Sequence, residues 1–123
     1  MPNGTMSNLE RLQAWYQAQC NEDWEHQFGV KISTLDNPGW KLEIDLEGTE
    51  LEKAQFDELK VNYDSESDWI ICQVKDRKFV GASGPLLLDK MVAAFLEWSD
   101  SIQKIQARDA VNCASAKSVK RQE

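Results

Sequence analysis

The sequence predicts an α+β fold: an antiparallel sheet of four to five strands, with an N-terminal and a long C-terminal helix packed on one face. Three observations favour it. Apolar residues near both ends of the chain recur at intervals of three and four, which is the spacing of an amphipathic helix. In the middle they alternate with polar residues, as in half-buried strands, and turn-forming residues separate these segments. The chain has 123 residues, enough for one core, and we expect the second sheet face to meet solvent.

The first element is a helix from about Asn8 to Cys20. Ser7 is a good N-cap, and Glu10, three residues later, completes a capping box. One apolar face is formed by Leu9, Leu12, Trp15 and Tyr16. The spacing therefore predicts a helix that packs on the rest of the domain through that face.

A hairpin of two strands follows the helix. Residues 28–33 and 40–47 each alternate apolar and polar side chains, so each strand has one buried face. The run Asp36-Asn37-Pro38-Gly39 between them consists of residues that favour turns. We expect the two strands to pair antiparallel.

The next segments predict the remainder of the sheet. Residues 49–55 form either a short helix or a crossing loop, and residues 59–63 form a third strand. After a polar turn at 64–68, we expect a strand from Trp69 to Val74 with Trp69 in the core, then a short strand at Phe79-Val80.

The last element is a long helix. Residues 81–84 predict a flexible connection, and Pro85 suits the first position of the helix. Apolar spacing continues through Ile105, so the helix could reach Arg108. We expect one domain over residues 1–108 and a frayed or disordered tail over 109–123.

Negative charge gathers in the middle of the chain. The net charge is −7, and residues 43–68 hold ten acidic side chains against two lysines. Glu43, Asp45 and Glu47 alternate along one strand, about 7 Å apart on one face, where a cationic partner would relieve their repulsion. The alternative is an ordinary solvated face with cross-strand partners such as Lys31 or Lys60.

Two tryptophans and three further acids complete the candidate binding surface. Trp24 and Trp40 flank the first strand and are either anchors for a partner or core and lid packing residues. Asp57, Glu58 and Asp64 form a possible rim.

Catalytic and metal-binding patterns are weak. The three cysteines, Cys20, Cys72 and Cys113, form no CxxC motif, so we expect reduced thiols, no metal and no cofactor. The acidic balance disfavours nucleic-acid binding. The chain also has no apolar run long enough to span a membrane and no signal-peptide pattern at its start. A small hydrolase or transferase using Cys72, Ser83 or His26 remains an alternative.

The segment around the hairpin resembles a known family. Asp36-Asn37-Pro38-Gly39-Trp40, preceded by Asp23-Trp24-Glu25-His26, is similar to the immunity protein 53 family. Weaker similarity includes Asp68-Trp69-Ile70, the Gly81–Pro85 segment and Phe95-Leu96-Glu97-Trp98, so the resemblance covers about Leu9 to Trp98.

This resemblance implies an antidote of a bacterial polymorphic toxin system. Such a protein is a small, non-enzymatic, cytoplasmic inhibitor that binds a secreted toxin domain, and the family offers no catalytic residue to transfer. The acidic middle suits a basic target such as a nuclease. We expect a monomer or homodimer, and a homodimerising structural subunit is a further alternative.

Overall fold

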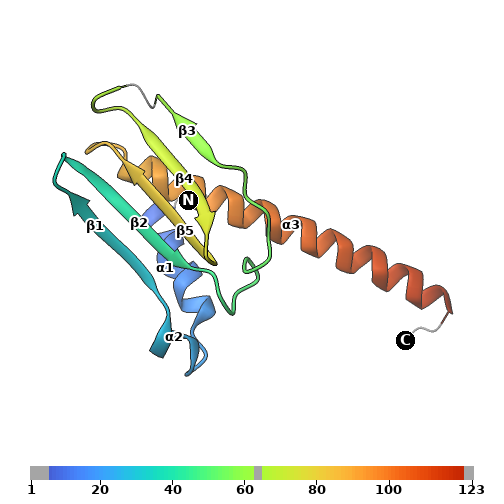
Figure 1. The fold of residues 1–123 in the computed structure, drawn as a ribbon. Coiled ribbons are helices and arrows are strands. Elements are labelled where there is room, and N and C mark those ends of the chain that lie inside the picture. Colours follow the sequence, from blue (N-terminus) through green and yellow to red (C-terminus); the bar gives the residue numbers. More distant parts are fainter. Residues whose placement is uncertain (1–5, 63–64, 121–123) are drawn as a thin grey trace.

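The computed structural model describes residues 6–62 and 65–120, with side chains up to residue 105 (Figure 1). It confirms the α+β fold, with five strands in one antiparallel sheet of order β1-β2-β5-β4-β3. The elements in chain order are α1 (Asn8–Gln19), α2 (Trp24–Gln27), β1 (Val30–Leu35), β2 (Gly39–Asp45), β3 (Leu59–Val61), β4 (Ile70–Lys75), β5 (Lys78–Ser83) and α3 (Leu88–Lys120).

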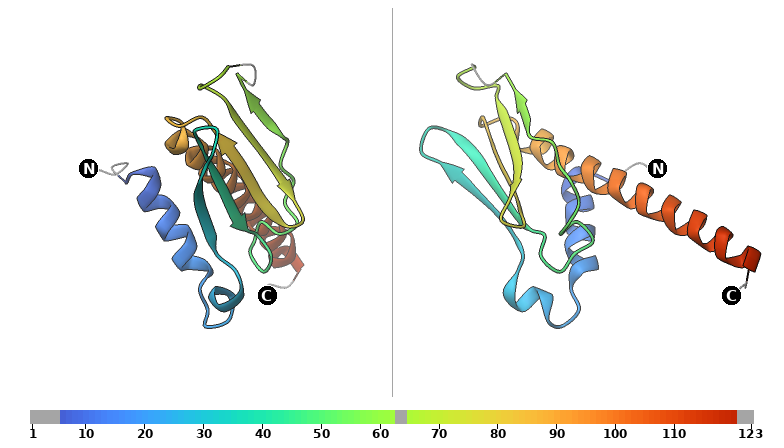
Figure 2. Two further views of the ribbon diagram at one scale, coloured as in Figure 1. Left: turned by 60° about the vertical axis from the view of Figure 1, so that its left-hand side comes forward. Right: turned by 45° about the vertical axis from the view of Figure 1, so that its right-hand side comes forward.

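Helices α1 and α3 cover the same face of the sheet (Figure 1; Figure 2, right), as predicted. The core between the two layers is rich in aromatic side chains. Phe79 of β5 lies 5.1 Å from Phe95 and 6.1 Å from Trp98 of α3, measured between ring centroids. Because these contacts join the central strand to the long helix, they fix the two layers to each other.

The predicted start of α1 is confirmed in detail. The Ser7 hydroxyl accepts the Glu10 backbone N–H at 3.1 Å, and the Glu10 carboxylate accepts the Ser7 N–H at 2.8 Å. Two of the N–H groups that a helix leaves without partners are thereby satisfied. The predicted β1–β2 hairpin is also confirmed, with Leu35 opposite Gly39 at its turn.

The segment between β2 and β3 is a series of turns rather than a helix. Leu51 is fully buried and anchors it, and Phe56 packs on both Phe79 and Trp98 at about 5 Å between centroids. The Trp98 indole N–H donates to the Gln55 carbonyl oxygen at 2.9 Å. The loop is therefore tied to the core along its length.

The largest correction concerns β5. Residues 81–83 are not a flexible connection, because they continue β5, which lies at the centre of the sheet. Gly81 faces α3, and a β-carbon there would lie 2.8 Å from the Met91 sulfur. Glycine is thus needed at this position for close helix–sheet packing. Local sequence instead indicates a turn-forming residue.

Two smaller predictions also need correction. Pro85 lies in a turn before α3, which begins at Leu88, so it does not occupy the first helical position. Trp69 precedes β4 and is only partly buried, whereas Ile70 and Cys72 supply the core side chains of that strand.

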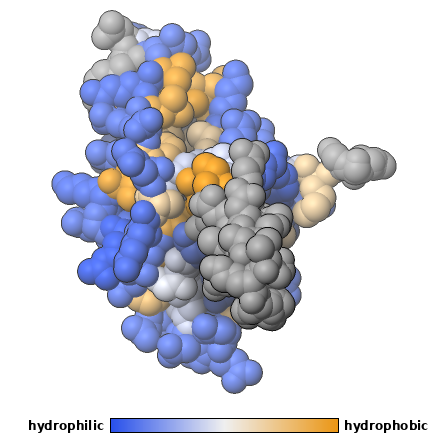
Figure 3. Space-filling view, turned by 90° about the vertical axis from the view of Figure 1, so that its right-hand side faces the viewer, coloured by the Kyte–Doolittle hydropathy of each residue, from blue (hydrophilic) through white to orange (hydrophobic). Residues whose placement is uncertain are grey.

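Helix α3 is longer than expected and projects past the sheet (Figure 1). It runs to Lys120 and so continues beyond Arg108. The division into a domain of residues 1–108 and a tail of 109–123 stays a prediction. The side of the molecule seen in Figure 3 is mainly hydrophilic, with small separate hydrophobic areas.

Candidate functional site

Among the described residues, no helix covers one face of the sheet (Figure 2). Strand register identifies its members, because directly paired residues project to the same side and residues along a strand alternate. Two neighbouring rows of paired residues run across the sheet on this side. The first row consists of Lys31, Glu43, Val80 and Gln73, and the second of Ser33, Lys41, Ala82, Ile71 and Lys60. We call the following residues the open face: Lys31, Ser33, Leu35, Lys41, Glu43, Asp45, Lys60, Ile71, Gln73, Lys75, Lys78, Val80 and Ala82.

The open face is not acidic. Its lysines outnumber its carboxylates five to two. The acids of β2 do alternate on this side, as predicted, but the lysines of the neighbouring strands project to the same side. Lys75 and Lys78 even lie opposite each other. An acidic run in the sequence therefore does not become an acidic surface here.

Each of the three alternating acids has a cationic partner. Glu43 lies 3.3 Å from the Lys41 ammonium, Asp45 lies 3.7 Å from Lys78, and Glu47 lies 3.6 Å from Arg77. Asp45 also accepts the Gly29 backbone N–H at 2.9 Å, which ties the start of β1 to the end of β2. These contacts favour the alternative of a charge-balanced face, although the partners differ from the lysines that we named.

The remaining described acids of residues 43–68 lie outside β2. Asp57 and Glu58 are exposed on the loop that enters β3, whereas Glu66 and Asp68 lie in the turn between β3 and β4. Glu52 shares Arg77 with Glu47. Asp64 lies outside the described residues. Of the predicted rim, Asp57 and Glu58 therefore lie together on one loop, and the rim itself stays a prediction.

The two flanking tryptophans pack against the protein itself. Trp24 is buried, and its indole N–H donates to the Glu47 carbonyl oxygen at 2.8 Å. Trp40 is partly buried on the helix-covered side of the sheet, and its N–H donates to the Pro85 carbonyl oxygen at 2.9 Å. Both observations favour packing over anchoring.

The candidate nucleophiles are poorly placed for catalysis. Cys72 is fully buried, and desolvation raises the pKa of its thiol to about 12. Ser83 is also fully buried and donates its hydroxyl to the Gly84 carbonyl oxygen at 3.0 Å. His26 is exposed on α2 and lines a pocket together with Lys78. Lys78 is the first residue of β5 and Ser83 is the last, so His26 lies near the end of the strand that is far from Ser83. These positions count against a hydrolase using those groups.

No metal-binding cluster of three or more His, Cys, Asp or Glu side chains occurs within the described ranges. None of the described helices has the length and apolar character needed to cross a membrane.

The lysines of β4 and β5 are the surface residues that the sequence analysis missed. Lys75 and Lys78 flank the Asp76-Arg77 turn, and both alternate with core residues such as Val74 and Phe79. That alternation was visible in the sequence. Its meaning depends on the strand order, because the Lys78 side chain meets the acids of β2 only where β5 pairs with β2.

Comparison with known proteins gives one match. A family model described as immunity protein 53 matches residues 9–100. No curated protein and no solved structure shows a significant match.

Proposed function

Since this chain belongs to the immunity protein 53 family, we propose that it binds a cognate toxin domain in the cytoplasm and neutralises it through the open face. The observation that carries the choice of surface is that no described helix or loop covers this face, while α1 and α3 cover the opposite face. A protein partner could cover it without rearranging the fold. An interface of ordinary size buries about 1,200–2,000 Å² in total.

The composition of the open face suits a protein partner. Ile71, Val80 and Ala82 are partly exposed on β4 and β5, two of the three inner strands, and give an apolar centre. Charged residues surround it, and the Lys41–Glu43 and Lys78–Asp45 pairs are already oriented within the free protein. This arrangement of an apolar centre with a polar surround is common in protein interfaces.

The charges favour an acidic contact surface on the toxin. Lys31 and Lys75 are exposed, and neither forms an ion pair with a carboxylate in the described part of the chain. The sequence suggested a basic nuclease because an acidic face would attract one. Glu43, Asp45 and Glu47 are each paired with a cation, so the acidic face no longer supports that choice of toxin. Glu43 and Asp45 stay in the proposed contact surface as members of ion pairs.

The test needs the toxin, which we expect to be the C-terminal domain of a secreted protein encoded beside this chain. Co-expression should protect cells from that domain, and the purified proteins should form a complex. Reversing two exposed charges, Lys31→Glu with Lys75→Glu, should weaken binding at least tenfold and slow association at low salt. Lys90→Glu, an exposed reversal on α3, is the matched control and should bind as the unmodified protein does.

The choice of toxin and the choice of binding surface can each be refuted separately. If the unmodified chain neither binds nor protects against the domain, the assignment of that toxin is wrong. If it binds and the double reversal has no more effect than Lys90→Glu, the toxin contacts another surface.

A further inference from the structure

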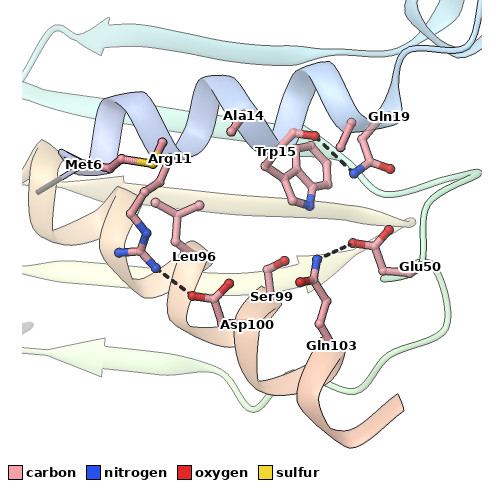
Figure 4. Close-up of a pocket in the computed structure, with 11 residues that line it drawn as sticks. Met6, Arg11, Ala14, Trp15, Gln19, Glu50, Leu96, Ser99, Asp100 and Gln103 are labelled. Atoms are coloured by element: carbon pink, nitrogen blue, oxygen red, sulfur yellow. Dashed lines mark hydrogen bonds and ion pairs between the residues drawn. The ribbon is translucent and has the colours of Figure 1, made fainter. Parts of the chain in front are cut away.

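A pocket of about 420 Å³ lies between α1 and α3, on the side of the sheet away from the open face (Figure 4). Its wall is formed by side chains of both helices and by Glu50 from the β2–β3 loop. Its size is within the range of small-ligand sites. A toxin seated on the open face would leave this pocket free.

Two polar atoms in the pocket wall have no hydrogen-bond partner in the part of the chain that the structure describes. The Trp15 indole nitrogen and the Ser99 hydroxyl are both buried, in residues that are 6% and 1% exposed, and neither has a partner among the described residues. Figure 4 shows the indole nitrogen of Trp15 directed toward Ser99 and Gln103 on α3. A buried donor without an acceptor costs about 1–3 kcal/mol, so each such group needs an explanation.

Three of the four other tryptophans contrast with Trp15. The indole N–H groups of Trp24, Trp40 and Trp98 each donate to a backbone carbonyl oxygen at 2.8–2.9 Å. Trp15 is as deeply buried as Trp24, yet its N–H is directed at a pocket instead of a carbonyl. A molecule bound in the pocket could supply the acceptor that the Trp15 N–H lacks among the described residues.

Two interactions bound the pocket. On one side, Arg11 forms an ion pair with Asp100 at 2.7 Å. On the other, the Gln103 carboxamide donates to the Glu50 carboxylate at 3.1 Å. Gln103 is exposed and lies on the surface, so a rotation of its side chain would open the pocket above Trp15 and Ser99.

We propose that this pocket binds a small molecule through a neutral carboxamide group. The amide oxygen accepts from the Trp15 indole and the Ser99 hydroxyl. The amide N–H donates to Glu50, replacing the carboxamide of Gln103 that Glu50 already binds. A carboxylate ligand is disfavoured, because the pocket lining contains Glu50 and Asp100 against the single cation Arg11.

The test is an NMR titration of the indole N–H resonances with acetamide. The Trp15 resonance should shift and saturate, with a dissociation constant on the order of 10 mM for so small a ligand. The indole resonances of Trp24, Trp40 and Trp98 serve as internal controls and should move little, because their N–H groups already have partners. Acetate at the same concentrations should not saturate the Trp15 shift.

Two serine variants of α3 make the test specific. Ser99→Ala removes one of the two groups that hold the amide oxygen and should weaken acetamide binding about tenfold. Ser101→Ala is the matched control, because its hydroxyl donates to the Trp98 carbonyl oxygen and does not line the pocket. The toxin domain should leave the Trp15 resonance unshifted, which separates a free small molecule from a side chain of the toxin.

Three results would overturn the proposal. A Trp15 shift that stays linear with acetamide would mean that the pocket holds water only. Equal saturation by acetate would exclude the neutral amide as the ligand class. A Trp15 shift caused by the toxin domain would assign the pocket to the toxin. The first two results do not depend on whether the chain neutralises a toxin through the open face, so they test the pocket separately from the proposed function.

Discussion

Gly84, at the end of β5, lies against the backbone of Ser67 in the β3–β4 turn. A β-carbon at Gly84 would overlap the Ser67 carbonyl oxygen, and the Gly84 N–H donates to the neighbouring Trp69 carbonyl oxygen at 2.9 Å. Because the obstructing atom is backbone, no side-chain rotation can relieve the contact. Gly84 thus fixes how the turn closes over the end of the central strand.

Gly84→Ala should therefore destabilise the fold strongly. We expect the free energy of unfolding in urea to fall by about 2–3 kcal/mol, the range for overpacking at a rigid site. Gly29→Ala is the matched control, because nothing lies within 4 Å of a β-carbon there. Similar losses for the two variants would refute the close approach of Gly84 and Ser67.

Asp45 and Glu43 should differ in their effect on stability. Asp45 pairs with Lys78, accepts the Gly29 N–H and has only 17% of its side chain exposed, so Asp45→Ala should cost about 1–2 kcal/mol. Glu43 pairs with Lys41 near the surface, and Glu43→Ala should cost less than about 0.5 kcal/mol. Urea denaturation of the two variants tests this difference, and equal costs would contradict it.

Burial of Cys72 makes stability depend on alkaline pH. Its folded pKa, raised to about 12, lies above the unfolded thiol value of about 8.5. Between these values the unfolded chain has lost the thiol proton while the folded chain keeps it, so stability falls as pH rises. Below about pH 8 the thiol makes no pH-dependent contribution.

This dependence can be measured in a Cys20→Ser, Cys113→Ser background. The free energy of unfolding between pH 8 and 11 should fall more steeply there than after the further change Cys72→Ala, since other groups titrate equally in both. Parallel pH profiles would show that Cys72 ionises as readily in the folded state as in the unfolded chain.

The sequence predicted the parts of the fold that depend on local pattern. The capping box of Ser7 and Glu10, the hairpin turn at 36–39 and the apolar face of α3 follow from residues close together in the chain. It failed where distant segments decide the outcome. From local sequence, Gly81 favours a turn. The reason for a glycine in this strand is its close packing against Met91 of α3, which local sequence does not reveal.

The candidate surface shows the same limit. Alternation correctly placed Glu43 and Asp45 on the open face, but the charge of a surface also depends on the strands beside it. Lys78 reaches Asp45 only because β5 pairs with β2, although the two residues are far apart in the chain. Likewise, nothing local indicated that Trp15 would lack an acceptor, because that depends on how α1 meets α3.

The most direct test of the open face as the toxin-binding surface is methyl cross-saturation in the complex. The toxin domain is irradiated, and saturation is read at the methyl groups of a deuterated, methyl-protonated immunity protein. We predict transfer to Ile71, Val80 and Ala82 on the open face, and none to Ala14 and Ala18, which are exposed on α1. Transfer to the two α1 alanines without transfer to the sheet methyls would contradict the account.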